Sequence, residues 1–304
     1  MSGHIHPTRH LGLAILINAV IFIVELIGGL LTNSLALISD AFHNLSDVVA
    51  LILSFGAARL ARKKPSAEKT YGYGRFEILA ALINAVTLVA IGGYIIYEGI
   101  LRLMNPAPVA GKWMIIIAVV GFLANTASAL LLRGDAKQNL NSRSAYLHLM
   151  TDALESLGVI VVGILIYWKG WYLLDPLVSI VIGIFIIKST WEILSETVEM
   201  LTEGTPRSIS LHAVADFMHA FSGIENVHHL HIWSVGSGFK ALSAHLVVSN
   251  RLISEGELIT TDLAKALKDK FDIDHPTFQL ESIPCQDQGI LVDPAQTNRS
   301  DDIS

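Results

Sequence analysis

Six long apolar stretches, separated by short polar connections, occupy the first two thirds of the chain. They run roughly over residues 11–31, 35–58, 77–100, 113–132, 145–168 and 172–190. The hydrocarbon core of a bilayer needs about 20 mostly apolar residues per helix, which is close to the length of each stretch. The pattern therefore predicts an α-helical membrane protein with six transmembrane helices, in a domain that covers residues 11–203.

The last third of the chain has another pattern. Residues 207–221 have helical periodicity, 227–235 and 240–248 have the composition of strands, 254–271 form an amphipathic helix, and 275–282 form a last strand. This α-β-β-α-β order predicts a small α+β domain over residues 204–290, with its helices on one face of a sheet. Residues 1–10 form a short N-terminal segment, and the polar residues 291–304 are expected to be disordered.

Composition supports a membrane protein. Charged residues make up 16% of the 304 residues and hydrophobic residues 52%, whereas soluble domains have about 25% charged residues. A single cysteine, Cys285, excludes an internal disulfide and a zinc cage built from several cysteines. The formal net charge of −6 argues against a nucleic-acid partner. The chain has no GxxxxGK[ST] loop, which argues against an ATP-driven pump.

Basic residues are distributed unevenly among the connections between the apolar stretches. Those after the second and fourth stretches contain Arg59, Arg62, Lys63, Lys64, Lys69, Arg75, Arg133, Lys137 and Arg143, and the opposite connections contain only Arg102, Lys112 and Lys169. Lys and Arg collect on the cytoplasmic side of membrane proteins, so both termini are expected to be cytoplasmic. The basic residues after the second stretch are expected to face anionic lipid headgroups.

Two HxxxD pairs lie inside apolar stretches, where ionisable side chains are costly. His43 and Asp47 occur in "AFHNLSDVV", and His148 and Asp152 in "YLHLMTDAL". A spacing of four residues is about 400° of helical rotation, so the members of each pair project from one face. Both pairs lie at similar depths, and together they would supply two imidazoles and two carboxylates, a suitable tetrahedral site for zinc. The alternative is that each pair only neutralises itself.

Two further acidic residues, Asp40 and Glu25, lie in these apolar stretches. Asp40 lies one turn before His43 and is either a carboxylate near the entry to this site or a cap near water. Glu25 is expected to hydrogen-bond between helices, the commoner role of buried polar groups in membranes.

The chain resembles a known family, the cation diffusion facilitators. The blocks that carry the resemblance are "SLALISDAFHNLSD", "YGYGRFEILAALINA", "SAYLHLMTDALESLGVI", "LTEGTP", "VHHLHIW" and "LSAHLVV", in order over roughly residues 11–285. The resemblance implies a homodimeric exporter of divalent metal driven by inward proton flow, with six helices and a cytosolic metallochaperone-like domain. It implies that His43, Asp47, His148 and Asp152 form the transport site. Histidine at both first positions resembles the zinc-preferring branches.

The resemblance also implies a metal site in the cytosolic domain. His228, His245 and Glu281 match it best, and His231 and His275 are possible additional ligands. By strand alternation His229 is expected to face away from His228 and His231. Cys285 lies near a position that some relatives use for metal. In the loop after the second stretch Lys69 and Tyr73 stand where some members have histidines, so no metal is expected there. The N-terminal histidines either capture metal or belong to a flexible terminus, and they are His4, His6 and His10.

The expected function is zinc export in exchange for protons, in the inner membrane of a bacterium. His43 and His148 are the expected proton carriers, because a free imidazole has a pKa of about 6.5. Zinc is the expected transported ion and the expected ligand of the cytosolic site. Alternatives are an exporter of Cd²⁺, Co²⁺, Fe²⁺ or Mn²⁺, an intramembrane metalloenzyme, and a metal-sensing receptor. No HExxH motif is present, which argues against the enzyme.

Overall fold

The computed structural model of the chain describes residues 9–61, 63–133, 140–236, 238–283 and 289–291. The chain divides into two compact units. The first consists of residues 1–55 and 81–194, and the second of residues 56–80 and 195–304. The N-terminal His4 and His6, Cys285, and residues 292–304 of the expected disordered tail lie outside the described residues.

Six long helices are described before residue 202. They are α1 (Arg9–Thr32), α2 (Leu35–Ala61), α3 (Arg75–Met104), α4 (Gly111–Leu132), α5 (Leu140–Lys169) and α6 (Leu174–Leu201). Among the described residues, α3, α4, α5 and α6 are each long and apolar enough to cross a membrane, and residues 16–32 of α1 form a shorter apolar helix. Many large apolar side chains on these helices are exposed, including Leu31, Val181 and Trp168, which is expected of a surface that faces lipid.

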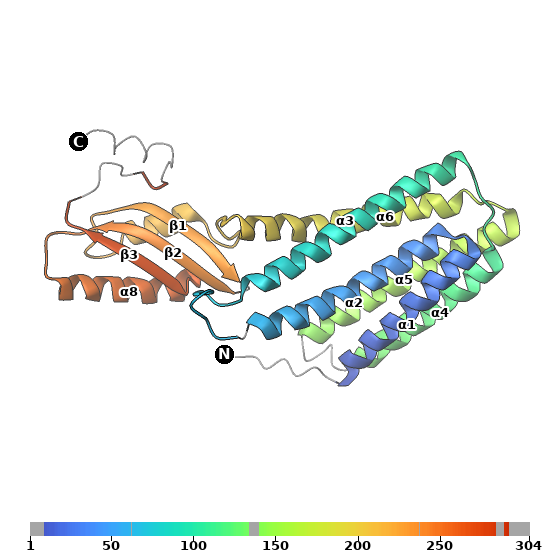
Figure 1. Ribbon diagram of the computed structural model, residues 1–304, viewed down its shortest axis with the longest axis horizontal. Helices are drawn as coiled ribbons and strands as arrows, with labels where there is room; N and C mark the ends of the chain where they lie inside the picture. The colour runs from blue at the N-terminus through green and yellow to red at the C-terminus, as the bar shows by residue number, and fades with distance from the viewer. Residues whose placement is uncertain (1–8, 62, 134–139, 237, 284–288, 292–304) are drawn as a thin grey trace. The chain divides into compact units, whose positions relative to one another are not determined.

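The long helices form two groups in the first unit. Figure 1 shows α1, α2, α4 and α5 as one group and α3 beside α6. Buried residues of α2, α4 and α5 form one apolar core, including Leu37, Met114 and Val159. The α3–α6 contact is close because glycines face it. A Cβ atom on Gly92 would lie 3.0 Å from the Gly183 carbonyl oxygen, and one on Gly183 would lie 3.1 Å from the Gly92 oxygen. Small residues at such contacts let helix backbones approach in membranes.

The start of α2 is held by a carboxylate from α6. Asp175 accepts hydrogen bonds from the Ser34 hydroxyl at 2.6 Å and from the backbone N–H groups of Leu35 at 2.7 Å and Ala36 at 3.3 Å. The first N–H groups of a helix have no intrahelical partner, so a buried carboxylate satisfies them as an N-cap would. This contact fixes the starting point of α2, the helix that carries His43 and Asp47.

The remainder of the chain forms the predicted α-β-β-α-β domain. Its elements are α7 (Leu211–His219), β1 (Asn226–Gly236), β2 (Phe239–Val247), α8 (Ile253–Phe271) and β3 (His275–Glu281). The sheet order is β1-β2-β3, with β1 and β2 antiparallel and β2 and β3 parallel. The tight β1–β2 turn uses Gly238 at φ 79°, and α8 provides the crossover to β3.

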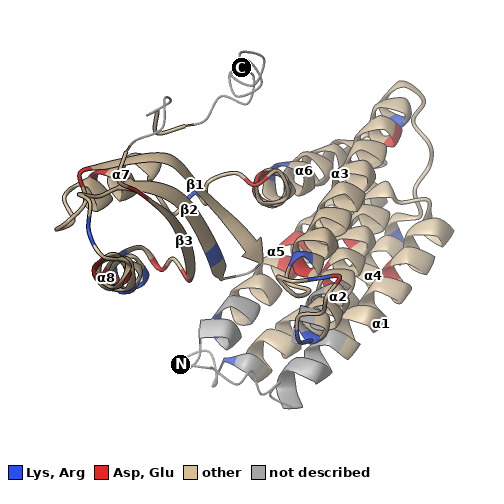
Figure 2. Cartoon of the chain, turned by 60° about the vertical axis from the view of Figure 1, so that its left-hand side comes forward, with Lys and Arg blue, Asp and Glu red and all other residues tan. Residues whose placement is uncertain are grey.

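One face of this sheet carries both helices, as predicted. The core joins residues of α7, β1, β2 and α8 in a single cluster, including Met218, Leu230, Leu246 and Leu263. Figure 2 shows charged residues to be sparse along the long helices and frequent on α8, which matches a membrane domain followed by a water-exposed one.

The helix ends differ from the apolar stretches that predicted them. The expected sixth span ends at residue 190, whereas α6 continues to Leu201. The added residues include Glu192, Glu196 and Glu199, which are too polar for a hydropathy pattern yet favourable in a helix. Hydropathy therefore located the apolar part of the helix and not its end.

Candidate metal centres

The two HxxxD pairs meet between α2 and α5, and each histidine lies closest to the carboxylate of the other helix. The Nε2 atom of His148 is 2.9 Å from Oδ2 of Asp47, and Nε2 of His43 is 3.5 Å from Oδ1 of Asp152. Within each helix the histidine and aspartate are farther apart, at 3.9 Å on α2 and 3.8 Å on α5. The four residues therefore form one cluster, paired between the two helices, instead of two self-neutralising pairs.

The dimensions of the cluster suit a small divalent ion. All four donor atoms lie within 4.8 Å of one another. Ligands of a tetrahedral zinc ion lie about 2.0–2.2 Å from the metal, which places them about 3.3–3.6 Å apart. The side chain of Asp152 is 1% exposed and that of His148 is 43% exposed, so one side of the cluster is buried and the other is accessible. Two carboxylates would balance the ion's charge where water is scarce.

A second polar cluster, on α1, α2 and α5, adjoins these four residues. Asp40 on α2 is 1% exposed and accepts a hydrogen bond from the Ser156 hydroxyl of α5 at 3.3 Å. Asp40 is thus no water-exposed cap, which excludes that reading. Glu25 of α1 accepts a hydrogen bond from Asn44 Nδ2 of α2 at 2.7 Å, so it does hydrogen-bond between helices, as expected.

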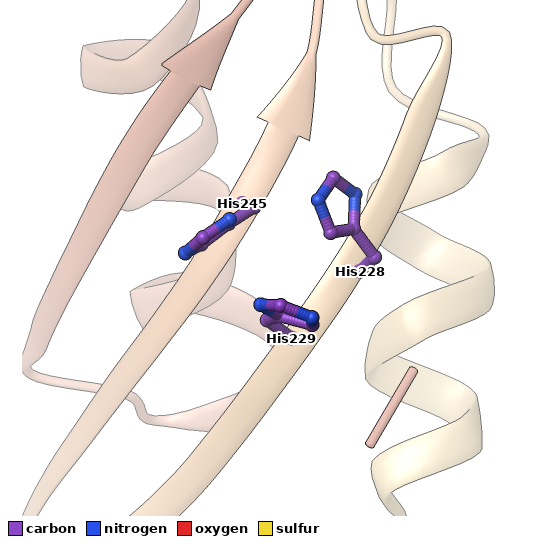
Figure 3. Close-up of side chains that lie close together, drawn as sticks. All are labelled: His228, His229 and His245. Carbon is purple, nitrogen blue, oxygen red and sulfur yellow. The ribbon is translucent and has the colours of Figure 1, made fainter. Parts of the chain in front are cut away.

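In the C-terminal α-β-β-α-β domain, three histidines and one glutamate lie together. Figure 3 shows the rings of His228 and His229 from β1 beside that of His245 from β2. Their ring centroids are 4.7–5.1 Å apart, and one nitrogen from each lies within 4.8 Å of the others. Glu281, at the end of β3, reaches His228 Nε2 at 3.2 Å and His245 Nδ1 at 2.8 Å. Three imidazoles and a carboxylate are also a suitable zinc ligand set.

The expectation that His229 faces away from His228 is wrong. The β1–β2 register shifts between His228 and His231, and His229 adopts a left-handed backbone with φ 49°. Such a bulge places two successive residues opposite one on the partner strand and redirects side chains. The apolar positions explain the bulge, because Val227 and Leu230 are three residues apart and both enter the core, which a regular strand would not allow. That spacing is a sequence signal for the bulge, and strict alternation overlooks it.

The two additional candidates, His231 and His275, lie away from this group. His231 pairs with Ser243, which lies two residues before His245 on β2. The His231 side chain is exposed and lines a cavity of about 740 Å³ together with Trp233 and Lys69. His275 begins β3, whereas Glu281 ends it, a separation of about 20 Å along a strand. Its ring stacks on Phe239 with centroids 6.2 Å apart. The side chain of His10 is outside the described part of the structure.

Burial affects the protonation of His228. Burial lowers the pKa of the His228 imidazole below its ordinary value, and the neighbouring rings of His229 and His245 act in the same direction, whereas Glu281 opposes them. Metal binding requires a neutral imidazole, so the lowered pKa leaves His228 ready to act as a ligand at neutral pH.

Comparison with known proteins agrees with this architecture. A family model described as the cation efflux transmembrane domain matches residues 11–202, and a second, the cation efflux protein cytoplasmic domain, matches residues 206–283. The chain belongs to the cation efflux family. Members of this family, also called cation diffusion facilitators, are transporters, so the chain is a multi-pass membrane transporter of metal cations and not an enzyme.

Several curated cation efflux proteins are similar over nearly their whole length. The chain is 44% identical over 283 residues to a "Cadmium, cobalt and zinc/H(+)-K(+) antiporter" of Bacillus subtilis, which covers 92% of this chain and 91% of that protein. It is 38% identical to the metal cation efflux system protein CzcD of Cupriavidus metallidurans over 93% of this chain and 90% of that one. It is 37% identical to the zinc transporter ZitB of Escherichia coli, over 93% and 91%.

One solved structure, the metal-bound C-terminal domain of the C. metallidurans CzcD transporter, is also similar in sequence. It is 37% identical, covers 24% of this chain and 99% of that chain, and has a TM-score of 0.22.

Proposed function

We propose that this cation efflux protein exports divalent metal, zinc above all, from the cytoplasm of a bacterium in exchange for protons. The observation that carries the proposal is the cross-paired cluster of His43, Asp47, His148 and Asp152. Two imidazoles and two carboxylates favour zinc over harder ions such as Mg²⁺ or Mn²⁺. The names of similar proteins, which include cadmium, cobalt and zinc antiporters and zinc transporters, support the same class of substrate.

Exchange with protons follows from the chemistry of the ligands. Imidazole and carboxylate must be deprotonated to hold metal, so protonation on the outer side would expel zinc and deprotonation on the inner side would restore the site. His43 and His148 are the ligands whose free imidazoles titrate nearest neutral pH. The name of the B. subtilis relative, an antiporter of metal with H⁺ and K⁺, supports exchange as the mode of transport.

The cytosolic cluster of His228, His229, His245 and Glu281 has a regulatory role in this proposal. It would bind zinc when the cytoplasmic concentration is high and favour the transporting conformation of a homodimer. The cytoplasmic-domain match supports a location inside the cell for this part of the chain, and the basic loops support cytoplasmic termini in the inner membrane. The ranges 11–203 and 204–290 remain our proposed division between the membrane and cytosolic domains.

The test is zinc uptake into vesicles that contain the purified protein. His148→Ala removes one of four ligands, so uptake should fall to the level of protein-free vesicles while the protein stays folded. His212→Ala is the matched control, because His212 is an exposed histidine on α7 and should leave uptake unchanged. Unchanged uptake by His148→Ala would refute the four-residue site, and the absence of uptake by the parent protein would refute zinc transport itself.

A further inference from the structure

Two carboxyl groups outside the proposed transport site are buried in the same polar region between the helices. Glu25 on α1 is 0% exposed and Asp40 on α2 is 1% exposed, and both lie in the space around Ser156 of α5 and Gly121 of α4. Asn44 donates to Glu25 at 2.7 Å and Ser156 donates to Asp40 at 3.3 Å. None of the ion pairs found among the described residues pairs either carboxyl with a lysine or arginine. Nothing in the proposed metal chemistry requires this pair.

The surroundings of the pair are shaped to hold it. Gly121 on α4 faces Glu25, and a Cβ atom there would collide with Glu25 Oε1 and lie 3.6 Å from the Ser156 hydroxyl. Helices α1, α2, α4 and α5 thus all contribute to one small polar chamber. Neutral donors from Asn44 and Ser156 keep the carboxyls in place without supplying positive charge.

Two neighbouring carboxyls in such a buried chamber, with no cation beside them, cannot both be ionised without strong repulsion. Carboxylate dyads of this kind hold one shared proton over a wide pH range. The charge of a nearby ion then decides whether that proton stays, because a bound divalent cation stabilises two negative charges where an empty site does not.

The pair lies close enough to the transport site for this effect. Asp40 precedes His43 by about one helical turn on α2, and Ser156 follows Asp152 by about one turn on α5, rises of about 4.5 Å and about 6 Å. The charged or titratable groups that act on the pair from these helices are His43, Asp152 and Glu155, and α4 presents only Gly121 and, one turn later, Asn125.

We propose that Glu25 and Asp40 share one proton while the transport site is empty and release it when a divalent cation binds, so that the pair is an additional proton carrier of the exchange. This inference rests on the proposed function, because it needs metal to bind at the four-residue site. The proton moves between a carboxyl group of the pair and water. No other bond changes.

A row of buried polar side chains marks a route for this proton. Helices α1 and α4 are antiparallel neighbours, since the N–H of Ala110 donates to the Thr32 carbonyl at 3.0 Å and Gly121 lies against Glu25. Farther along the same contact lie Asn125 and Ser128 of α4 and Asn18 of α1. All three are buried, and each has a polar side-chain atom without a hydrogen-bond partner among the described residues. Such groups are usually bridged by ordered water, which conducts protons.

The test measures protons and zinc together in vesicles, with a pH-sensitive dye and a zinc-sensitive dye trapped inside. Glu25→Gln and Asp40→Asn keep the shape of each side chain and remove its charge. Each should lower the number of protons exchanged by about one per zinc, because either change abolishes the shared proton. The double variant should lose no more than each single one. Ser39→Ala, a buried and untitratable change on α2, should leave the ratio at the parent value.

An unchanged ratio in both single variants would overturn the proposal, and so would additive losses in the double variant. A second measurement covers variants that fold poorly. Infrared difference spectra of the detergent-solubilised parent should show a protonated carboxyl band that disappears when zinc binds and is missing from Asp40→Asn. A parent spectrum with no such band would contradict the proposal. A parent that binds zinc with this spectral change but transports none would refute the proposed function and leave the proton pair standing.

Discussion

His43 and His148 each lie nearer to the aspartate of the other helix than to that of their own. This has a mechanical consequence. Zinc holds ligands within a few tenths of an ångström of their preferred distances, so a small displacement of α2 against α5 would open both short contacts at once. A site shared between two helices can be made and broken by helix movement, whereas a site on one helix cannot.

The second residue-scale feature is His229, which a β-bulge turns toward His228 and His245. We expect it to be a zinc ligand of the cytosolic cluster. His229→Ala should weaken zinc binding at least about 10-fold, since changes outside the direct ligands already cost about 10–100-fold. Calorimetry on the full-length protein measures this effect, in a background with Asp47→Ala and Asp152→Ala so that the transport site does not bind.

The control for this prediction is His231→Ala in the same background. His231 lies on the same strand but is exposed and outside the cluster, so zinc affinity should not change. Equal losses from the two variants would show that the bulged geometry does not select the ligand.

These residues show what the sequence could predict. The HxxxD spacing placed His43 with Asp47 and His148 with Asp152 on helix faces, because four residues are close to one turn. The pairing of each histidine with the aspartate of the other helix depends on how α2 and α5 are shifted along their axes relative to each other. Residue spacing within a single helix does not encode that shift. His229 was misassigned because alternation assumes a regular strand, whereas the core needed both Val227 and Leu230. The burial of Glu25 and Asp40 in one polar region involves two helices and has no local pattern at all.

At the scale of elements, the long helices are positioned by a few special contacts. Asp175 caps α2 from α6, and the facing glycines Gly92 and Gly183 let α3 and α6 approach closely. The positions of the helices were predictable from apolar length, and so was the order of the cytosolic elements. Which helices contact each other was not predictable. Facing glycines and a single buried carboxylate show which helices pair only after the helices are packed.

Neighbouring glycines on α3 allow a matched test of this packing. Gly92→Leu places a side chain against Ile187 and the Gly183 carbonyl of α6, so it should destabilise the protein by about 1–3 kcal/mol and reduce zinc flux. Gly93→Leu puts the same side chain on the same helix where a Cβ meets nothing within 4 Å, and it should be nearly neutral. Thermal unfolding in detergent compares the two variants. Similar unfolding temperatures would mean that α3 and α6 do not depend on this approach.

At the scale of the whole molecule, the energetics favour exchange. Moving a divalent ion outward against an inside-negative potential of about 100 mV costs about 4.6 kcal/mol, and each entering proton returns about 2.3 kcal/mol before any pH gradient is counted. At least two protons per zinc are therefore needed to balance the voltage. The two ligand histidines can supply them, and the Glu25–Asp40 pair adds a further carrier close by.

We expect a proton gradient to drive metal through the four-residue cluster. The most direct measurement is zinc uptake into vesicles with an imposed pH gradient, acid inside, for the parent protein and His148→Ala. We expect the parent's uptake to rise with the size of the gradient and to collapse when an ionophore dissipates it, and we expect His148→Ala to show neither response. Parent uptake that ignores the pH gradient and follows only an imposed electrical potential would contradict proton-driven export.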